Sequence, residues 1–466
     1  MIYSASIIFA CSIIQALVST VLAIVLVLPV AHFFYRFDFP GKHLCLSLAS
    51  MLSIMPTKLV AFCVTLFYGL DGFGGIILSH LMLNVPFVLY VLHTTYQKLD
   101  VSLLWLAADA GASAWQSYKD VVFPFLFSTI GSLFLLLFLL HFSSFSIPLL
   151  MGSKIWHNTP EVMIYTLYQG SDSLYAFVYW IIRLLIIVPL FMWHNRYGIQ
   201  PTKISSLPKF QRPCRYSPFF YTIWWLVYCG FVGALILGPL IALGIRACDI
   251  KIFSFLKTVI TGVIDTTIGV AIYQVIINSL ALAVVSALGA VLIAFGIGMV
   301  KFKLGNRYSS IISGLTIFAF ILGSVGTGIL FSFISYGKLL SSFLVGVLCH
   351  IFLNYAFAYR IIRGQLVLYH PDIHRTAQMC GATFKKAICS VALPFVLPAI
   401  YKAFCVSFGL SLTEIGAGAI LQSSMGLTLP MAIRMYRKAG NQEAVITLSL
   451  ILLLLVLLTS YFFTKK

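Results

Sequence analysis

The stretch VITLSLILLLLVLLTSYFF, residues 445–463, contains no charged residue and has nearly the length that a membrane-spanning helix needs, about 20 apolar residues. The rest of the chain is similar in character. Its 466 residues are 61% hydrophobic and 9% charged, with a mean hydropathy of +1.03. Soluble domains carry about 25% charged residues, so this composition excludes a water-soluble enzyme, a nucleic-acid-binding domain and a disordered protein. Strands of a membrane barrel alternate in polarity, whereas these runs are continuous. The sequence therefore predicts an all-α polytopic membrane protein.

The apolar runs predict about eleven membrane spans. Their limits are 5–33, 44–69, 74–96, 123–145, 174–193, 219–245, 267–300, 309–335, 339–362, 393–413 and 445–463. The 30 basic residues against 12 acidic ones fit Lys and Arg retained in cytoplasmic loops, not nucleic-acid binding. No Lys or Arg precedes Arg36. We therefore expect the first segment to be a true span, with the N-terminus outside and the C-terminus in the cytoplasm.

Sequence patterns of chemical sites are missing. The ten cysteines form no CxxC pair and no cluster with histidine, so we expect neither a metal site nor disulfides. No GxxxxGK[ST] phosphate-binding loop, Ser/His/Asp set or paired carboxylates occur. The sequence predicts no catalytic residue, no cofactor and no enzyme activity of its own.

An internal repeat divides the chain. At an offset of 270 residues, matched polar, glycine and proline residues recur without a gap over about eighty residues. The matched pairs include His80 and His350, Asn84 and Asn354, Gly111 and Gly381, and Pro124 and Pro394. Six predicted spans separate the two glycines, which makes the repeat parallel. A polar stretch with three prolines favours a linker at 201–216, between a first half at 1–200 (about five spans) and a second half at 217–466 (about six).

One motif recurs in the predicted cytoplasmic loops 98–122 and 366–392. Each copy has Ala, then Gly four residues on, a small residue next, and a hydrophobic-Pro pair with the Pro thirteen residues after the Gly. The copies are Ala107, Gly111, Ala112, Phe123, Pro124 and Ala377, Gly381, Ala382, Leu393, Pro394. Ala and Gly at positions i and i+4 would share a helix face that admits another protein's backbone. The Gly also permits a turn between two short helices, and the Pro suits the first turn of the next span.

This pattern resembles the "EAA" loop of permease subunits from bacterial binding-protein-dependent ABC importers. In that family the loop forms two short coupling helices that dock on the ATPase. The resemblance covers nearly the whole chain, as in fused two-half permeases of the inner membrane, the type I importer fold. The family's Glu is replaced by Trp105 and Arg375, and its second Ala by Leu106 and Thr376.

The resemblance implies partners and a cargo. A cytoplasmic ATPase, in two copies, would dock on the two loops, and an extracytoplasmic solute-binding protein would deliver the cargo to outer loops 146–173 and 414–443. The run from Thr413 to Gly416 followed by Thr428-Leu429-Pro430 is similar to thiamine permeases. This favours thiamine or its phosphate esters, with ferric iron as the alternative. An ion-coupled secondary transporter is the alternative of another class, although acidic residues within the spans are nearly absent.

Polar residues at membrane depth are candidates for the translocation path. These are Lys58, Asn84, Arg183, Asn354 and Glu414. Lys58 and Arg183 would either line the path or belong to structural ion pairs, because unpaired charge in hydrocarbon is costly. Lining the path unpaired, they would repel a bare cation and favour a cargo with negative charge. Asn84 and Asn354 more often make interhelical hydrogen bonds.

The topology is testable with compartment reporters. A reporter at the N-terminus or at residues 155–160 should read as periplasmic, and reporters at 203–210 or after Lys466 as cytoplasmic, because the span count places these segments on opposite sides. Reporters at residues 155 and 205 that read on the same side would contradict the span count and the parallel repeat together.

Overall fold

The computed structural model divides the chain into two compact units, the first unit Met1–Ile245 and the second unit Arg246–Lys466. The structure describes residues 2–36, 41–42, 45–46, 49, 55, 57–152, 154, 157–170, 172–197, 223, 227, 230, 238–249, 265–304, 309–336, 341–366, 369 and 371–464. The predicted linker 201–216 lies outside these residues. The halves at 1–200 and 217–466 therefore stay a prediction, although the contacts divide the chain only after Ile245.

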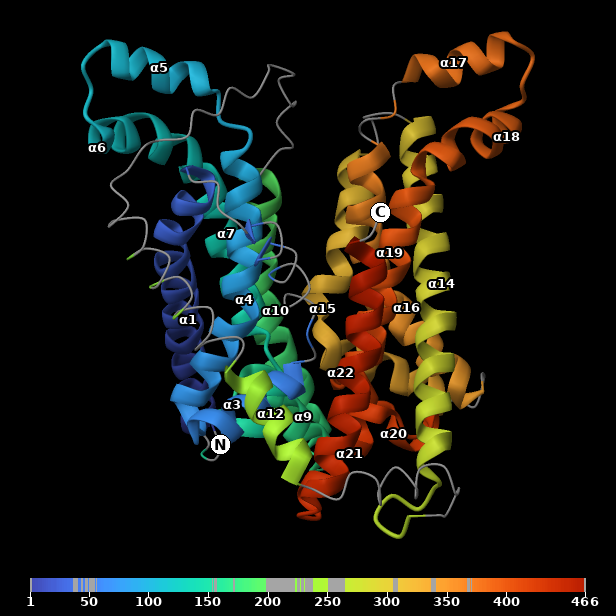
Figure 1. Cartoon of the computed structure of the whole chain (residues 1–466). Helices are drawn as coiled ribbons and strands as arrows, with labels where there is room; N and C mark the ends of the chain where they lie inside the picture. Colours follow the sequence, from blue (N-terminus) through green and yellow to red (C-terminus); the bar gives the residue numbers. More distant parts are fainter. Residues whose placement is uncertain are drawn as a thin grey trace. The chain divides into compact units, whose positions relative to one another are not determined.

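In the first unit, long helices run alongside one another and short helices lie at both ends (Figure 1). The long helix α1 contacts both α4 and α7, and α7 contacts α10. The helices are α1 (Ile2–Arg36), α3 (Thr57–Tyr68), α4 (Gly72–Tyr96), α5 (Val101–Asp109), α6 (Ala114–Ser117), the π-helical turn η1 (Tyr118–Val122), α7 (Phe123–Phe142), α8 (Ser146–Met151), α9 (Pro160–Gln169) and α10 (Ser173–Tyr197).

The second unit has the same arrangement of long helices and end helices (Figure 1). Helix α14 contacts α16 and α19, and α19 contacts α22. The helices are α14 (Ile272–Leu304), α15 (Ser309–Tyr336), α16 (Ser342–Leu366), α17 (Pro371–Met379), α18 (Phe384–Ala387), the π-helical turn η5 (Ile388–Ala392), α19 (Leu393–Thr413), α20 (Gly416–Met425), α21 (Leu429–Lys438) and α22 (Gln442–Thr464). The helix α12 (Gly238–Asp249) crosses the boundary between the units.

The 270-residue repeat found in the sequence is also present in the secondary structure. The bounds of α4 and α16, of α5 and α17, and of η1 and η5 differ by 270 residues at both ends. The two halves therefore share one sequence of elements, including an interruption by a π-turn at the same place. This confirms the predicted all-α architecture in two repeated halves.

Eight of the described helices are long and apolar enough to cross a membrane. They correspond to the predicted spans apart from 44–69, 219–245 and 309–335. The first two of these ranges contain residues outside the described part of the chain. The third is α15, where Gly323 adopts a non-helical conformation at φ +70°. The hydroxyl of Thr327 donates to the Gly323 carbonyl at 2.6 Å, one turn earlier in the helix.

Lipid explains why these helices are apolar on all sides. In the first unit Ala23, Val27 and Ala31 of α1 pack into a core with residues of α4 and α7. In the second unit Ala294, Ala358 and Ala403 bring three helices together. Small residues at such contacts are typical of membrane helices. The opposite faces expose large apolar side chains, such as Leu185 at 70% and Leu292 at 71%. In water these surfaces would be unstable, whereas in hydrocarbon they are solvated.

Candidate functional site

The repeated motif folds into a helical hairpin that we call the docking hairpin: α5 and α6 in the first unit, α17 and α18 in the second. In each unit it lies beyond the end of the long helices (Figure 1). Gly111 and Gly381 end the first helix with φ of +80° and +85°. The amide of Gly111 donates to Ala108 O at 2.9 Å, and that of Ala112 donates to Ala107 O at 2.9 Å. This pair of bonds is the Schellman motif, which satisfies the last carbonyls of a helix.

The second hairpin repeats the same cap. Gly381 donates to Gln378 O at 2.9 Å and Ala382 donates to Ala377 O at 3.1 Å. The Ala-x-x-x-Gly-small spacing is thus a helix ending followed by a turn, as predicted. The other interpretation, that Ala107 and Gly111 share a helix face, is wrong, because both glycines lie past the helix end. A Cβ built on either glycine meets no atom within 4 Å, so the requirement for glycine here comes from the backbone conformation.

The hydrophobic-Pro pair explains the π-turn. Pro124 and Pro394 lie in the first turn of α7 and α19, as predicted. A proline inside a continuous helix lacks the amide proton and clashes with the carbonyl four residues earlier. In each unit the residue before the proline bonds five residues back instead, Phe123 to Tyr118 O and Leu393 to Ile388 O. The wider turn accommodates the proline and keeps the hairpin continuous with the span.

Local side chains fix the start of each hairpin helix. Asp100 caps α5: its Oδ1 accepts from the Ser102 hydroxyl at 2.7 Å and the Ser102 amide at 3.0 Å. These bonds, the hydroxyl bond first, lower the pKa of Asp100 below its usual value. Ser113 and Gln116 form a reciprocal capping pair at the start of α6, with N–H···O distances of 2.7 and 3.2 Å. Leu104 and Tyr118 pack against the core of the first unit.

A layer of buried polar side chains joins α1, α4 and α7 in the first unit. The imidazoles of His80 and His141 stack with centroids 4.4 Å apart. Asn84 Nδ2 donates to His141 Nε2 at 2.9 Å and to the His80 carbonyl at 3.0 Å. Gln15 Nε2 lies 2.7 Å from His80 Nδ1, and Thr20 Oγ1 lies 3.0 Å from His141 Nδ1. Asn84 is thus an interhelical hydrogen-bonding residue, the commoner of the two roles expected for it.

These contacts fix the protonation of both rings. Because amide N–H groups donate to His141 Nε2 and His80 Nδ1, each of these nitrogens is an acceptor. The remaining protons lie on His141 Nδ1, facing Thr20, and on His80 Nε2, which donates to Ser144 Oγ at 3.1 Å. A protonated imidazole has N–H donors on both nitrogens and no acceptor. A charged ring would therefore place one of its N–H groups against an amide N–H group. The layer therefore consists of neutral groups.

The second unit keeps this layer with different residues. His350 Nδ1 lies 2.7 Å from Ser411 Oγ, which lies 2.8 Å from Ser286 Oγ. Ser411 occupies the position equivalent to His141, which explains why comparing the repeats did not reveal His141. Asn354, the partner of Asn84 in the repeat, is 4% exposed in the same helix as His350. A role of Asn84 or Asn354 in the path stays a prediction.

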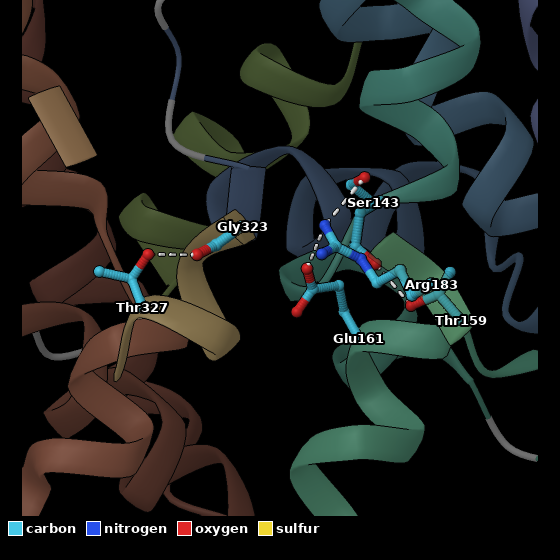
Figure 2. A network of polar contacts seen from close by, with 7 residues as sticks. Ser143, Thr159, Glu161, Arg183, Gly323 and Thr327 are labelled. Carbon is cyan, nitrogen blue, oxygen red and sulfur yellow. Dashed lines mark hydrogen bonds and ion pairs between the residues drawn. The ribbon is translucent and has the colours of Figure 1, made fainter. Parts of the chain in front are cut away.

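Arg183 lies in a buried ion pair (Figure 2). Its Nη2 is 2.6 Å from Glu161 Oε1, and both side chains are at most 1% exposed. The same nitrogen donates to Ser143 Oγ at 3.2 Å. Thr159, which precedes α9, donates to the Ser144 carbonyl at 2.5 Å. These bonds tie the start of α9 to α10 and to the end of α7. Arg183 thus has the ion-pair partner that one of the two interpretations required, and its place in the translocation path stays a prediction.

The two remaining candidate residues are Lys58 and Glu414. Lys58 is the second residue of α3, and its side chain lies outside the described part of the structure. Glu414 Oε1 accepts from the amides of Ile415 at 2.9 Å and Gly416 at 2.7 Å, so the carboxylate caps α20. Asn84 and Arg183 thus have partners within the first unit, and Glu414 has its partners within the second.

Sequence reasoning missed several residues. Glu161 is the only acidic residue between Asp120 and Asp172, but Asp172 lies closer to Arg183 in sequence, so distance along the chain did not single out Glu161. Arg360 and Lys402 lie inside two helices that meet the criteria for spans, yet neither was a candidate. Their charge at membrane depth was the available signal.

The ion pair gives a testable prediction. Removing one partner leaves an uncompensated buried charge, so Arg183→Gln or Glu161→Gln should each destabilise the protein by about 3–5 kcal/mol, whereas the double variant should recover most of that loss. The measurement is thermal unfolding of the purified protein in detergent. Lys438→Gln, which removes an exposed cation, is the matched control and should change little. Additive losses in the double variant would show that the two side chains act independently.

Comparison with known proteins shows which transport proteins this chain is similar to. Residues 234–464 match the family described as binding-protein-dependent transport system inner membrane component. The thiamine transport system permease protein of Haemophilus influenzae is 24% identical over 97% of this chain and 87% of its own length. The corresponding protein of Escherichia coli is 28% identical over 32% of each chain. The molybdate/tungstate transport system permease protein of Thermococcus kodakarensis is 25% identical over 26% of this chain and 50% of its own.

The family match covers the second half, the Haemophilus relative extends over both halves, and the repeated helices relate one half to the other. The chain belongs to the binding-protein-dependent permeases of ABC importers, as a multi-pass inner-membrane subunit that carries two permease halves in one polypeptide.

Proposed function

We propose that this permease imports thiamine or a phosphate ester of thiamine. The observation that carries the proposal is the full-length similarity to a thiamine permease, which extends over 97% of the chain. The outer segment around Glu414 supports it, because the carboxylate caps the short helix α20 that the thiamine-like sequence run encodes. Arg183 presents no objection to a cationic cargo, since Glu161 neutralises it.

The docking hairpins are the proposed connection to ATP hydrolysis. Two copies of a cytoplasmic ATPase bind one hairpin each, which requires both hairpins in the cytoplasm and the N-terminus outside. A binding protein delivers the cargo at the opposite face. Each hairpin continues through its π-turn into α7 or α19. In the first unit, Leu104 and Tyr118 anchor the hairpin to the core. A displacement of the hairpin is therefore transmitted to the long helices, and the halves rock between outward- and inward-open states.

The helix ending offers a test of docking. Valine at position 111 or 381 would have to adopt a left-handed conformation at a cost of about 1–2 kcal/mol, whereas asparagine tolerates it. We expect Gly111→Val and Gly381→Val to reduce the recovery of the ATPase with the purified permease, and Gly111→Asn to preserve it. Membrane levels of all variants serve as the control. Full ATPase recovery from a permease carrying both valines would contradict docking through these hairpins.

Uptake measurements test the cargo. Cells that lack their own thiamine permease should take up labelled thiamine or thiamine monophosphate when this chain is expressed with its ATPase and binding protein. Uptake should vanish when the phosphate-binding lysine of the ATPase is replaced, because the permease has no nucleotide site, and should persist after collapse of the proton gradient. Lys58→Gln, compared for thiamine and its ester, reports whether this cation recognises phosphate. Uptake of ferric iron instead of thiamine, or uptake without the ATPase, would overturn the proposal.

A further inference from the structure

The outermost helices of the two docking hairpins differ in chemistry at equivalent positions. On α5, Leu103, Trp105 and Leu106 are 46%, 37% and 64% exposed. At the matching positions of α17, Ile373 is 47% exposed, and Arg375 and Thr376 are exposed polar side chains. The backbone of the hairpin is thus repeated, whereas two of these three positions have changed from apolar to polar. Elsewhere on α17, Met379 is 87% exposed at the position of Asp109.

The charges of the hairpins differ in sign as well. Loop 98–122 has three acidic and two basic residues, whereas loop 366–392 has one acidic and three basic residues. Lys386 is exposed, and the Arg375 side chain is 72% exposed. Arg375 meets Asp372 of its own helix at 3.4 Å. An exposed pair of this kind is weak, so the guanidinium remains available to a partner.

Contact with lipid does not account for the apolar surface of α5. Both hairpins lie beyond the ends of the long helices of their own units (Figure 1). In α17 the equivalent positions carry Ile373, Arg375 and Thr376, and the two polar residues among them suit an aqueous location. Trp115 is 70% exposed but begins an apolar span, where interfacial tryptophan is common. The argument therefore rests on the three α5 residues alone.

We propose that the two hairpins hold the ATPase by different forces: the first buries Leu103, Trp105 and Leu106 against apolar residues of the ATPase, and the second uses Arg375 and Lys386 against acidic residues of the ATPase. The inference rests on the proposed docking of two ATPase copies. If the copies are identical, each has a groove with an apolar floor and an acidic rim, and each hairpin uses one part of it. Salt screens the second contact, because the Debye length falls from about 10 Å at 0.1 M to about 3 Å at 1 M, and leaves apolar burial intact.

The chain provides a native probe. Cys380 is exposed beside Gly381, and the equivalent residue of the first hairpin is Ala110, which is also exposed. Inside-out vesicles containing the permease and its co-expressed ATPase are treated with a maleimide at 0.1 M and 0.5 M NaCl, and the labelled peptides are quantified by mass spectrometry. The chain with Cys380 reports the second hairpin, and an Ala110→Cys, Cys380→Ser variant reports the first.

We expect the ATPase to protect both thiols at 0.1 M NaCl. At 0.5 M NaCl, labelling of Cys380 should rise about two- to fivefold, while labelling at position 110 stays constant. Exchanging the side chains should exchange the behaviour: Trp105→Arg should make protection of the first hairpin sensitive to salt, and Arg375→Trp should make the second insensitive. Arg375→Lys, which preserves the charge, should keep the salt response.

Three other outcomes would contradict either this inference or the docking itself. Equal salt responses at the two hairpins would overturn the inference while leaving docking intact. Protection of position 110 in vesicles without the ATPase would overturn it too, because lipid or a second copy would then cover α5. Lack of protection at both thiols with the ATPase present would instead contradict docking, and with it the proposed coupling.

Discussion

Hydrocarbon offers no hydrogen-bond partner, so every polar group inside the membrane has to find one within the chain. The described part of the structure meets this constraint in several ways. Helices satisfy the backbone, and where a proline removes a donor, as at Pro124, a π-turn re-pairs the neighbouring amide. Beside the break at Gly323, the Thr327 hydroxyl donates to the Gly323 carbonyl. Arg183, a charge that would be very costly in hydrocarbon, has a carboxylate and a hydroxyl within reach.

The same constraint shapes how the duplicated halves have diverged. The backbone elements keep their bounds, because changing one helix end would release several polar groups at once. The side chains have changed within this frame. Ser411 stands at the position of His141 and bonds to His350, the repeat counterpart of His80, whereas His141 bonds to Asn84. The hairpins lie beyond the ends of the long helices of their own units, where water can satisfy polar groups. There α5 and α17 differ at two of three matched exposed positions, Trp105 against Arg375 and Leu106 against Thr376.

Much of the architecture follows from sequence because lipid makes the apolar pattern nearly sufficient. Span positions and the hairpin with its glycine turn were predictable from runs of apolar residues and from the offset between Gly111 and Gly381. The pairing of buried polar side chains was not predictable from these patterns. Glu161 lies in a segment that the sequence assigns to an outer loop, and only the fold brings its carboxylate to Arg183. The stacking of His80 on His141 likewise depends on the crossing of α4 and α7, which periodicity does not specify.

The ion pair also changes what can be argued about the cargo. An isolated cation repels another with about 1.7 kcal/mol at 10 Å and an effective dielectric constant of 20. A close pair of opposite charges acts as a dipole, whose field falls off faster, so Arg183 contributes little to such a barrier. An electrostatic preference for an ester over free thiamine therefore does not come from Arg183, because Glu161 neutralises its charge.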